Sequence, residues 1–489
     1  MTELIRTAPV ARLSLGLSAA AGILALTACA VGPDYHRPKF DSAENYKESA
    51  DWKPSEPNDV LSRGPWWEIF KDADLNQLEA RIDISNENVK AAAAAFDQAR
   101  ALVAQARAGF WPTIAASVSR DYVGSGVTAA ANGTGQAAAA STRGLISNSA
   151  GISANWDLDV WGQIRRTVES NRASAQASAA ALAAARLSAQ AELATDYFEL
   201  RAQDQLQRLL DDTVVAEQLS LKITESRYKF GVAARADVVS AEAQLLSSQA
   251  QQVNAKIQRA ILEHAIAVLI GQLPAALTLA LTPMRADVPT VPAGVPSTLL
   301  ERRPDVAQAE RKMAAANAQI GVAKAAYFPS LTLSGSDVYT GPSMSELIRA
   351  PNRAWSFGPD LAETLFDGGL RRAQVSAARA AYDASVDNYR QTVLAGFQQV
   401  EDEIVTLRVL EQQAVIEDAA VAAAREAEKL TLNQYKAGTV PYSSVITAQT
   451  TRLSAEETAL TVLSSRLQAS VALIEAVGGG WNASQLPLP

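Results

Sequence analysis

Two very long runs free of helix-breaking residues constrain this chain more than any other feature. After Gly162, neither proline nor glycine occurs until Gly231, and alanine, leucine, arginine and glutamine fill the interval. These residues favour helix, and one helix of that extent would be about 100 Å long. A second run, from Leu370 to Ala437, is interrupted only by Gly396. Such lengths indicate coiled-coil or helical-barrel packing rather than an ordinary globular domain.

The sequence around these runs occurs twice. "NVKAAAAAFDQARALVAQARAGFWP" ends at Pro112, and "DVAQAERKMAAANAQIGVAKAAYFP" ends at Pro329, 217 positions later. "RYKFGVAARADVVSAEAQ", from Arg227, likewise matches "QYKAGTVPYSSVITAQT", from Gln434, at an offset of 207. The shorter offset is explained by a Gly/Ala-rich loop that is longer in the first copy. Two internal repeats are therefore predicted, each running helix, strand, loop, strand, very long helix, turn, helix.

The predicted strands alternate between apolar and polar residues. In "GISANWDLDVW", Ile152, Trp156 and Leu158 oppose serine, asparagine and aspartate. This pattern and length match a membrane β-barrel strand, although a soluble hairpin half-buried on a core gives the same alternation. Four strands cannot close a barrel, and an open edge is not tolerated in hydrocarbon. Strands in a membrane would thus require oligomerisation: two chains give eight strands, and three give twelve, enough for a water-filled lumen.

The single cysteine, Cys29, follows a basic start and a short apolar run. These features predict a secretory signal peptide over residues 1–28. Leu26-Thr27-Ala28-Cys29 also matches a bacterial lipobox, which predicts diacylglycerol and an N-acyl group on Cys29 as a membrane anchor. The next residue is Ala30, whereas lipoproteins kept at the inner membrane typically carry aspartate there. A plain secreted protein with a stray cysteine is the alternative.

Composition excludes several classes of function. The net charge of −8 makes the chain a poor ligand for nucleic acid. The sequence lacks HExxH, GxSxG, Walker and Cys/His-cluster motifs. Its two histidines, His36 and His264, are far apart in sequence and are expected on the surface or on helix faces. Neither an enzyme nor a metal site is predicted, and no cofactor beyond the covalent lipid.

An ordered set of motifs resembles a known family. After the lipobox come Gly32-Pro33-Asp34-Tyr35-His36-Arg37-Pro38, then "WWEIFKDADLNQLE" from Trp66, two Phe/Trp-Pro strand entries and two Tyr-Lys-x-Gly turns. Together they resemble TolC-like outer-membrane factors, more narrowly the lipid-anchored efflux proteins of the OprM/NodT group. The resemblance covers essentially the whole mature chain. It implies an α+β membrane protein: a homotrimer whose 12-stranded β-barrel, four strands per chain, continues into a long periplasmic α-helical barrel with an equatorial belt.

The repeats and the resemblance together predict a domain plan. The signal peptide, 1–28, precedes a lipidated segment, 29–65. The first repeat, 66–272, contains strands near 111–122 and 150–161 and a periplasmic tip near 228–237. An equatorial linker, 273–296, leads to the second repeat, 297–477, with strands near 329–340 and 354–365 and a tip near 435–445, and a tail spans 478–489.

The resemblance also assigns roles at the tips, which form the periplasmic entrance in this family. The residues implied in adaptor docking are Tyr228, Gly231, Val232, Tyr435, Gly438 and Thr439. For the gate, Asp237 and Tyr435 match positions that hold the entrance shut, and Arg235 is a substitute basic partner. Ser444 and Thr447 lie where some relatives carry constricting aspartates.

The function implied is a passive exit duct in the outer membrane of a Gram-negative bacterium. It would conduct small molecules from an inner-membrane pump of the resistance-nodulation-division type, through a periplasmic adaptor (membrane fusion protein), to the exterior. Two alternatives are the outer-membrane duct of a type I protein-secretion system and a pore-less, lipid-anchored periplasmic scaffold. The sequence does not name substrates.

Overall fold

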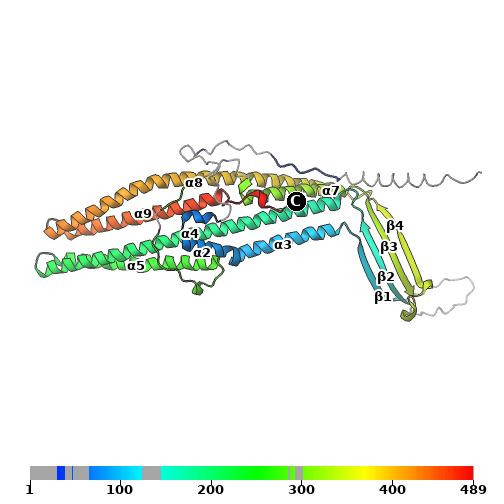
Figure 1. Ribbon diagram of the computed structural model, residues 1–489, viewed down its shortest axis with the longest axis horizontal. Coiled ribbons are helices and arrows are strands. Elements are labelled where there is room, and N and C mark those ends of the chain that lie inside the picture. The colour runs from blue at the N-terminus through cyan, green and yellow to red at the C-terminus, as the bar shows by residue number, and fades with distance from the viewer. Residues whose placement is uncertain are drawn as a thin grey trace, which may run out of the picture. The chain divides into compact units, whose positions relative to one another are not determined.

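The computed structural model describes residues 30–38, 47, 65–123, 145–284, 287–291 and 301–487. The predicted signal peptide, Cys29 and most of the segment up to residue 65 lie outside the described residues. The helices are α2 (Ala73–Ser85), α3 (Glu87–Ala108), α4 (Gln163–Lys229), α5 (Arg235–Leu269), α7 (Pro304–Ala325), α8 (Leu370–Ala437) and α9 (Tyr442–Ala476). The strands are β1 (Thr113–Val123), β2 (Leu145–Asp157), β3 (Ser330–Gly341) and β4 (Arg353–Ala362) (Figure 1).

The chain divides into two compact units. The first comprises residues 1–37, 98–175 and 312–386, and the second comprises 38–97, 176–311 and 387–489. Within the helices that the structure describes, no segment is long and apolar enough to cross a bilayer.

The first unit contains one four-stranded antiparallel sheet, in the order β1-β2-β3-β4 (Figure 1). The register pairs Ile114 with Ala154 and Trp156 with Leu333, and it pairs Leu331 with Leu361. Because side chains alternate between faces along each strand, this register gathers the large apolar residues on one face. The strands at both edges, β1 and β4, have no further partner within the described chain.

The bounds of strand β2 differ from those predicted from the sequence. Alternation predicted a strand near 150–161, but β2 begins at Leu145 and ends at Asp157. Beyond it, the Asp159 carboxylate accepts hydrogen bonds from the backbone N–H groups of Ile164 and Arg165, both at 2.9 Å. An aspartate in this role caps the start of a helix, so residues 158–162 form the turn into α4 instead of extending the sheet.

The long helices form where breakers are absent. Helices α4 and α8 have 67 and 68 residues, and α5 and α9 have 35 each. Gly396 does not interrupt α8. A Cβ at that position would meet Nε of Arg303 at 3.3 Å, so the glycine admits a close side chain while the helix continues.

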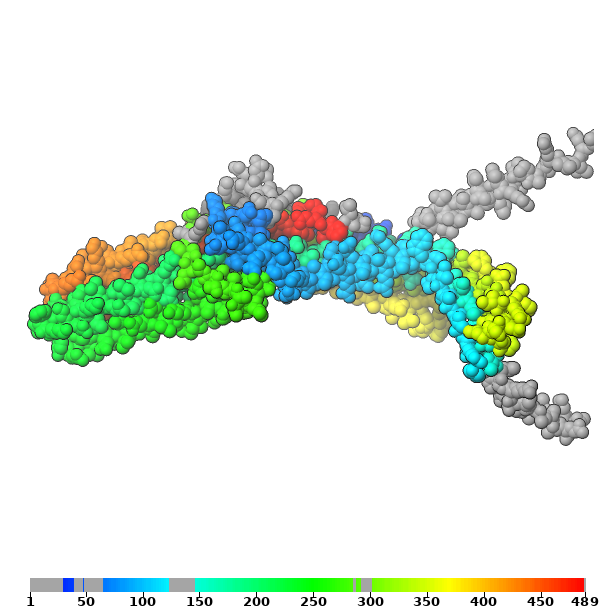
Figure 2. Space-filling model, turned by 60° about the horizontal axis from the view of Figure 1, so that its bottom comes forward, coloured from blue at the N-terminus to red at the C-terminus, as the bar shows by residue number. Residues whose placement is uncertain are grey.

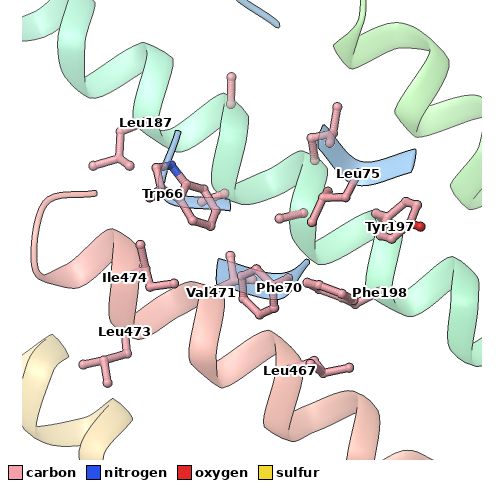
Figure 3. Packing of buried hydrophobic residues seen from close by; sticks show 14 of the residues in the cluster. Trp66, Phe70, Leu75, Leu187, Tyr197, Phe198, Leu467, Val471, Leu473 and Ile474 are labelled. Carbon is pink, nitrogen blue, oxygen red and sulfur yellow. The ribbon is translucent and has the colours of Figure 1, made fainter. Parts of the chain in front are cut away.

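The core of the second unit joins the first short helical elements to α4 and α9. A 3₁₀ turn over Trp66–Phe70 places Trp66 and Phe70 between these two helices, as Figure 3 shows. The Phe70 and Phe198 rings lie 4.8 Å apart, and the Trp66 indole N–H donates to Oε1 of Gln190 at 3.3 Å. This core holds the long helices together by apolar contacts, and its aromatic side chains bury the largest areas.

Candidate functional site

The turn between α4 and α5 is closed by a glycine in the left-handed region. Gly231 has φ +74°. Its N–H donates to the Tyr228 carbonyl at 2.9 Å, and the Val232 N–H donates to the Arg227 carbonyl at 2.8 Å. This is the Schellman pattern that satisfies the last carbonyls of a helix. The turn is therefore built from backbone bonds.

The turn between α8 and α9 has the same construction. Gly438 has φ +79°. Its N–H donates to the Tyr435 carbonyl at 2.9 Å, and the Thr439 N–H donates to the Gln434 carbonyl at 3.0 Å. Both long helices thus end by the same mechanism, at positions 207 residues apart.

Five of the six residues expected in adaptor docking lie on the surface of these turns. Val232 is 63% exposed, and Tyr228, Gly231, Gly438 and Thr439 are also exposed. Figure 2 shows the ends of α4–α5 in green and of α8–α9 in orange as free surface. These turns can therefore be reached by a partner.

Tyr435 is different, because it lies in the interior. It is 3% exposed and packs with Ala241, and its ring lies 5.1 Å from that of Tyr442. The Arg227 guanidinium lies 4.9 Å from the Tyr435 ring centroid and donates to the Lys436 carbonyl at 2.6 Å. A docking role for this ring would require the two hairpins to separate.

The residues expected at the gate differ in their exposure. Arg235 and Thr447 are exposed, whereas Asp237 and Ser444 are half-buried. The Thr447 hydroxyl donates to the Ser443 carbonyl in its own helix, at 3.1 Å. Among the described residues, no hydrogen bond or ion pair joins any two of the five gate residues, Tyr435 included. Asp237 lies in the first turn of α5, where a negative charge interacts favourably with the helix dipole.

A polar seam between the hairpins was not predicted from the sequence. Along one face of α4, four polar side chains are buried at helical spacing, and two from α9 meet them. We call this set the polar seam: Thr213, Glu217, Ser220 and Thr224 on α4, with Gln449 and Arg452 on α9. Gln449 donates to Ser220 Oγ at 3.3 Å, and Arg452 donates to Thr213 Oγ1 at 3.2 Å.

Arg452 is the charged centre of this seam. It forms ion pairs with Glu428 of α8, at 2.6 Å, and with Glu456 of its own helix. Glu456 also pairs with Arg425, at 2.6 Å. Removing one partner of such a half-buried network leaves an uncompensated charge, which is strongly destabilising.

Two seam residues are incompletely satisfied. Glu217 Oε1 accepts from Gln244 at 3.0 Å, but Glu217 Oε2 and Gln449 Oε1 are buried and have no hydrogen-bond partner within the part of the chain that the structure describes. Burial raises the pKa of Glu217 above its usual range, and burial raises the pKa of Tyr442 to about 12. Because unpaired buried acceptors cost free energy, this seam holds the hairpins together less firmly than an apolar core would.

In the part of the chain that the structure describes, no group of three or more His, Cys, Asp or Glu side chains is arranged to hold a metal ion. The candidate site is a pair of exposed helical turns, supported between the hairpins by the polar seam and by the apolar cluster around Tyr435.

Comparison with known proteins identifies the family. The sequence profile described as "Outer membrane efflux protein" matches residues 80–272 and 295–479. The probable efflux pump outer membrane protein TtgC of Pseudomonas putida is 28% identical over 471 residues, covering 95% of each chain. Nodulation protein T of Rhizobium leguminosarum bv. viciae is 31% identical, covering 97% of this chain and 96% of that protein.

Comparison with a solved structure also shows the same fold. The outer-membrane channel OprN superposes with a TM-score of 0.82 at 30% identity, covering 93% of this chain and 100% of that chain. The chain belongs to the outer membrane efflux protein family.

Proposed function

We propose that three copies of this chain form a passive exit duct in the outer membrane. The duct receives small molecules from an inner-membrane pump of the resistance-nodulation-division type through a periplasmic adaptor. The observation that carries this proposal is the sheet, which has four strands, two unpaired edges and one apolar face. Such a sheet is viable in hydrocarbon only when it closes.

The two faces of the sheet support lipid outside and water inside. Trp355 and Phe357 of β4 are each 72% exposed and alternate with small polar residues. On the opposite face, hydroxyl groups pair across strands: Ser119 with Ser149, and Ser336 with Ser356, both at 2.8 Å. Twelve strands from three chains would enclose a water-filled lumen.

The height of the apolar face also suits a membrane. Trp111, before β1, and Tyr122, near its end, are exposed aromatic residues. They lie eleven positions apart in sequence, and a fully extended stretch of that length is about 37 Å long and about 27 Å high at the usual strand tilt. Aromatic girdles flank an apolar band of about 25 Å in membrane barrels.

Exposed heptad stripes on the helices supply an interface between copies. Val239, Leu246 and Val253 of α5 recur every seven residues and are exposed. On α8, Ile416 and Leu430 lie fourteen residues apart and are also exposed. An unpaired heptad stripe is one half of a coiled-coil seam. Packing α5 of one copy against α8 of the next covers both, and such a head-to-tail contact closes into a ring.

Helices at equivalent places in the two repeats, α4 with α8 and α5 with α9, have nearly equal lengths. This supports an internal duplication. With two hairpins per copy, α4–α5 and α8–α9, three copies would contribute twelve helices to a periplasmic tunnel. The duct has no energy source of its own, so it would open when a partner binds the open state more tightly than the closed one.

The contacts of residues 279–282, in the described part of the linker 273–296, support its proposed role as an equatorial belt. Arg259 Nη2 donates to the Leu279 carbonyl at 2.6 Å, and the buried Asp204 carboxylate accepts from the Thr282 N–H at 3.2 Å. Asp204 is itself paired with Arg259 at 2.7 Å. These charge-assisted bonds are the strong ones, so they tie the linker to α4 and α5.

Lipidation of Cys29, by diacylglycerol on sulfur and an acyl group on the new N-terminus, completes the proposal. It rests on the lipobox and would hold the protein to outer-membrane lipid.

The experiment that tests the duct is photo-crosslinking at the tips. A photo-reactive residue at Val232 or Thr439 is exposed and can capture a partner in living cells, which mass spectrometry then identifies. Capture of an efflux adaptor is expected. Capture of a secretion-type adaptor would instead assign the chain to protein export. An absence of any adaptor at both tips, with normal expression, would contradict the docking role and favour the scaffold.

A further inference from the structure

The two β-hairpins of the sheet have the same register. Ser119 lies opposite Ser149 in β1–β2, and Ser336 lies opposite Ser356 in β3–β4. Ser336 comes 217 positions after Ser119, the offset of the two strand entries, and Ser356 comes 207 positions after Ser149, the offset of the two tips. The hairpins are therefore equivalent residue by residue, so each residue of one has a defined counterpart in the other.

Strands β2 and β3 join the two hairpins inside the chain, and in this pair Ala150 lies opposite Tyr339. The same offsets make Phe357 of β4 the counterpart of Ala150, and Tyr122 of β1 the counterpart of Tyr339. Strands β4 and β1 are the two free edges of the described sheet. In a ring of identical copies, each β4 edge meets the β1 edge of the next copy. The internal register would then place Phe357 opposite Tyr122.

The residues that this register brings together match in character. Phe357 and Tyr122 are both exposed aromatic residues in the single chain. Four positions along, Leu361 would lie opposite Val118, and both of these side chains are exposed as well. A slip of one residue would set apolar side chains against the polar face. A slip of two residues, in either direction, would replace one apolar pair by a pair with the charged Arg120.

Aromatic residues close the helix-side rim of the join inside the chain. Trp161, in the turn after β2, stacks on Phe328, before β3, with ring centroids 4.7 Å apart. The Trp161 indole N–H also donates to the Pro329 carbonyl at 2.8 Å. Beside this stack, the Leu158 N–H donates to the Leu331 carbonyl at 2.9 Å. The turn after β2 is thus fastened to the turn before β3.

The corresponding rim residues at the free edges are exposed. Phe328 corresponds to Trp111, 217 positions earlier, and Trp111 is 74% exposed. The turn after β4 carries Leu365 and Phe366, which are 94% and 89% exposed. Large apolar side chains therefore stand at both edges, at the places where Trp161 and its partner close the internal join.

We propose that the free edges of the sheet meet between copies in the register that β2 and β3 have inside the chain. Phe357 of one copy then lies opposite Tyr122 of the next, and Leu365 and Phe366 pack on Trp111 of the next copy. Offset or edge-to-face contact between aromatic rings adds to the free energy of burial. The proposal rests on the ring of three copies proposed above, and it specifies the residues that close each join.

Disulfide cross-linking of the full-length protein in detergent tests the register with four cysteine substitutions. The pairs in register are Phe357→Cys with Tyr122→Cys and Leu361→Cys with Val118→Cys. Exchanging the partners gives the matched controls, Phe357→Cys with Val118→Cys and Leu361→Cys with Tyr122→Cys. The exchanged pairs are displaced by four residues, about 13 Å along the strand, whereas a disulfide requires Cβ atoms about 4 Å apart.

Mild oxidation should give covalent dimers and trimers on a denaturing gel for the pairs in register and none for the exchanged pairs. The four single-cysteine variants control for reaction through Cys29. Light scattering before oxidation measures assembly in each sample. Trimers that cross-link through the exchanged pairs, or equally through both kinds, would overturn the register alone. Monomers without cross-links would overturn the ring of copies and the register with it.

The rim contact is tested by a double-mutant cycle. Trp111→Ala and Phe366→Ala should each lower the temperature at which the trimer dissociates in detergent. The double variant should dissociate at nearly the same temperature as the more affected single variant, because both changes remove one contact. Ile348→Ala, at an exposed apolar residue outside both edges, is the control and should have no effect. Fully additive shifts for Trp111 and Phe366 would overturn the contact.

Discussion

Glu79 of α2 provides the sharpest test of the energetics of this fold. Its side chain is 0% exposed, and neither carboxylate oxygen has a hydrogen-bond partner among the described residues. Burial, assisted by the charge of Asp83, raises the Glu79 pKa from 4.5 to about 9. The folded protein therefore keeps Glu79 protonated at neutral pH, whereas the unfolded chain releases the proton.

The sign of the pH dependence follows from proton linkage. Between the unfolded and folded pKa values the native state binds one more proton than the unfolded state, so stability falls as pH rises. The slope is about 1.4 kcal/mol per pH unit, so raising the pH from about 5.5 to about 7.5 costs about 2.7 kcal/mol at this residue. Below pH 4.5, the Glu79 contribution is constant.

Glu79→Gln should remove this dependence, because the amide has a similar shape and does not titrate. Guanidinium unfolding followed by the helical circular dichroism signal measures the free energy of unfolding of both proteins. The advantage of the variant should grow by about 2.7 kcal/mol over that pH interval. Glu87→Gln, at an exposed residue of α3, is the control and should show no such growth. An equal Glu79→Gln advantage at both pH values would refute the reasoning.

Three further perturbations test the tips, the seam and the assembly. Gly438→Ala should destabilise the α8–α9 turn by about 1–2 kcal/mol, because φ +79° disfavours a side chain, and faster proteolysis at the turn would report it. Arg452→Ala should loosen the hairpins and raise uptake of a large antibiotic by cells, whereas Lys429→Ala, at an α8 side chain that is 71% exposed and outside this network, should change it little; equal effects would contradict the central role of Arg452. Val253→Asp should convert trimers to monomers in detergent, measured by light scattering, while Lys256→Asp on the same helix should not.

The long helices could be predicted because proline and glycine, which break helices, are almost absent from two long stretches of the sequence. Helix α8 runs over Leu370–Ala437, the same interval that the sequence indicated. Apart from Gly396, this interval contains no helix-breaking residue. The end of β2 was misplaced for the opposite reason. Asp159 continues the apolar–polar alternation in the sequence, but its carboxylate caps α4. Alternation alone does not show which group a carboxylate will bind.

The polar seam was missed because a buried polar face has the same period as a solvated one. Thr213, Glu217, Ser220 and Thr224 follow helical spacing, and nothing in the sequence distinguishes them from a polar stripe that faces water. The sequence placed Tyr435 at the turn, but only the packing of α8 against α4 and α5 shows that its ring points inward.

The construction of the two turns has a consequence for how freely their surfaces can vary. Since Gly231 closes α4 through main-chain bonds, the side chain at Val232 carries no share of that turn's geometry, whereas the Thr439 hydroxyl donates to the Gln434 carbonyl at 3.0 Å and supports the other turn. Surface chemistry at Val232 can therefore change by mutation while the backbone of the α4–α5 turn is kept. A change at Thr439 instead removes one hydrogen bond from the α8–α9 turn, so the two tips differ in how freely their exposed residues can be exchanged.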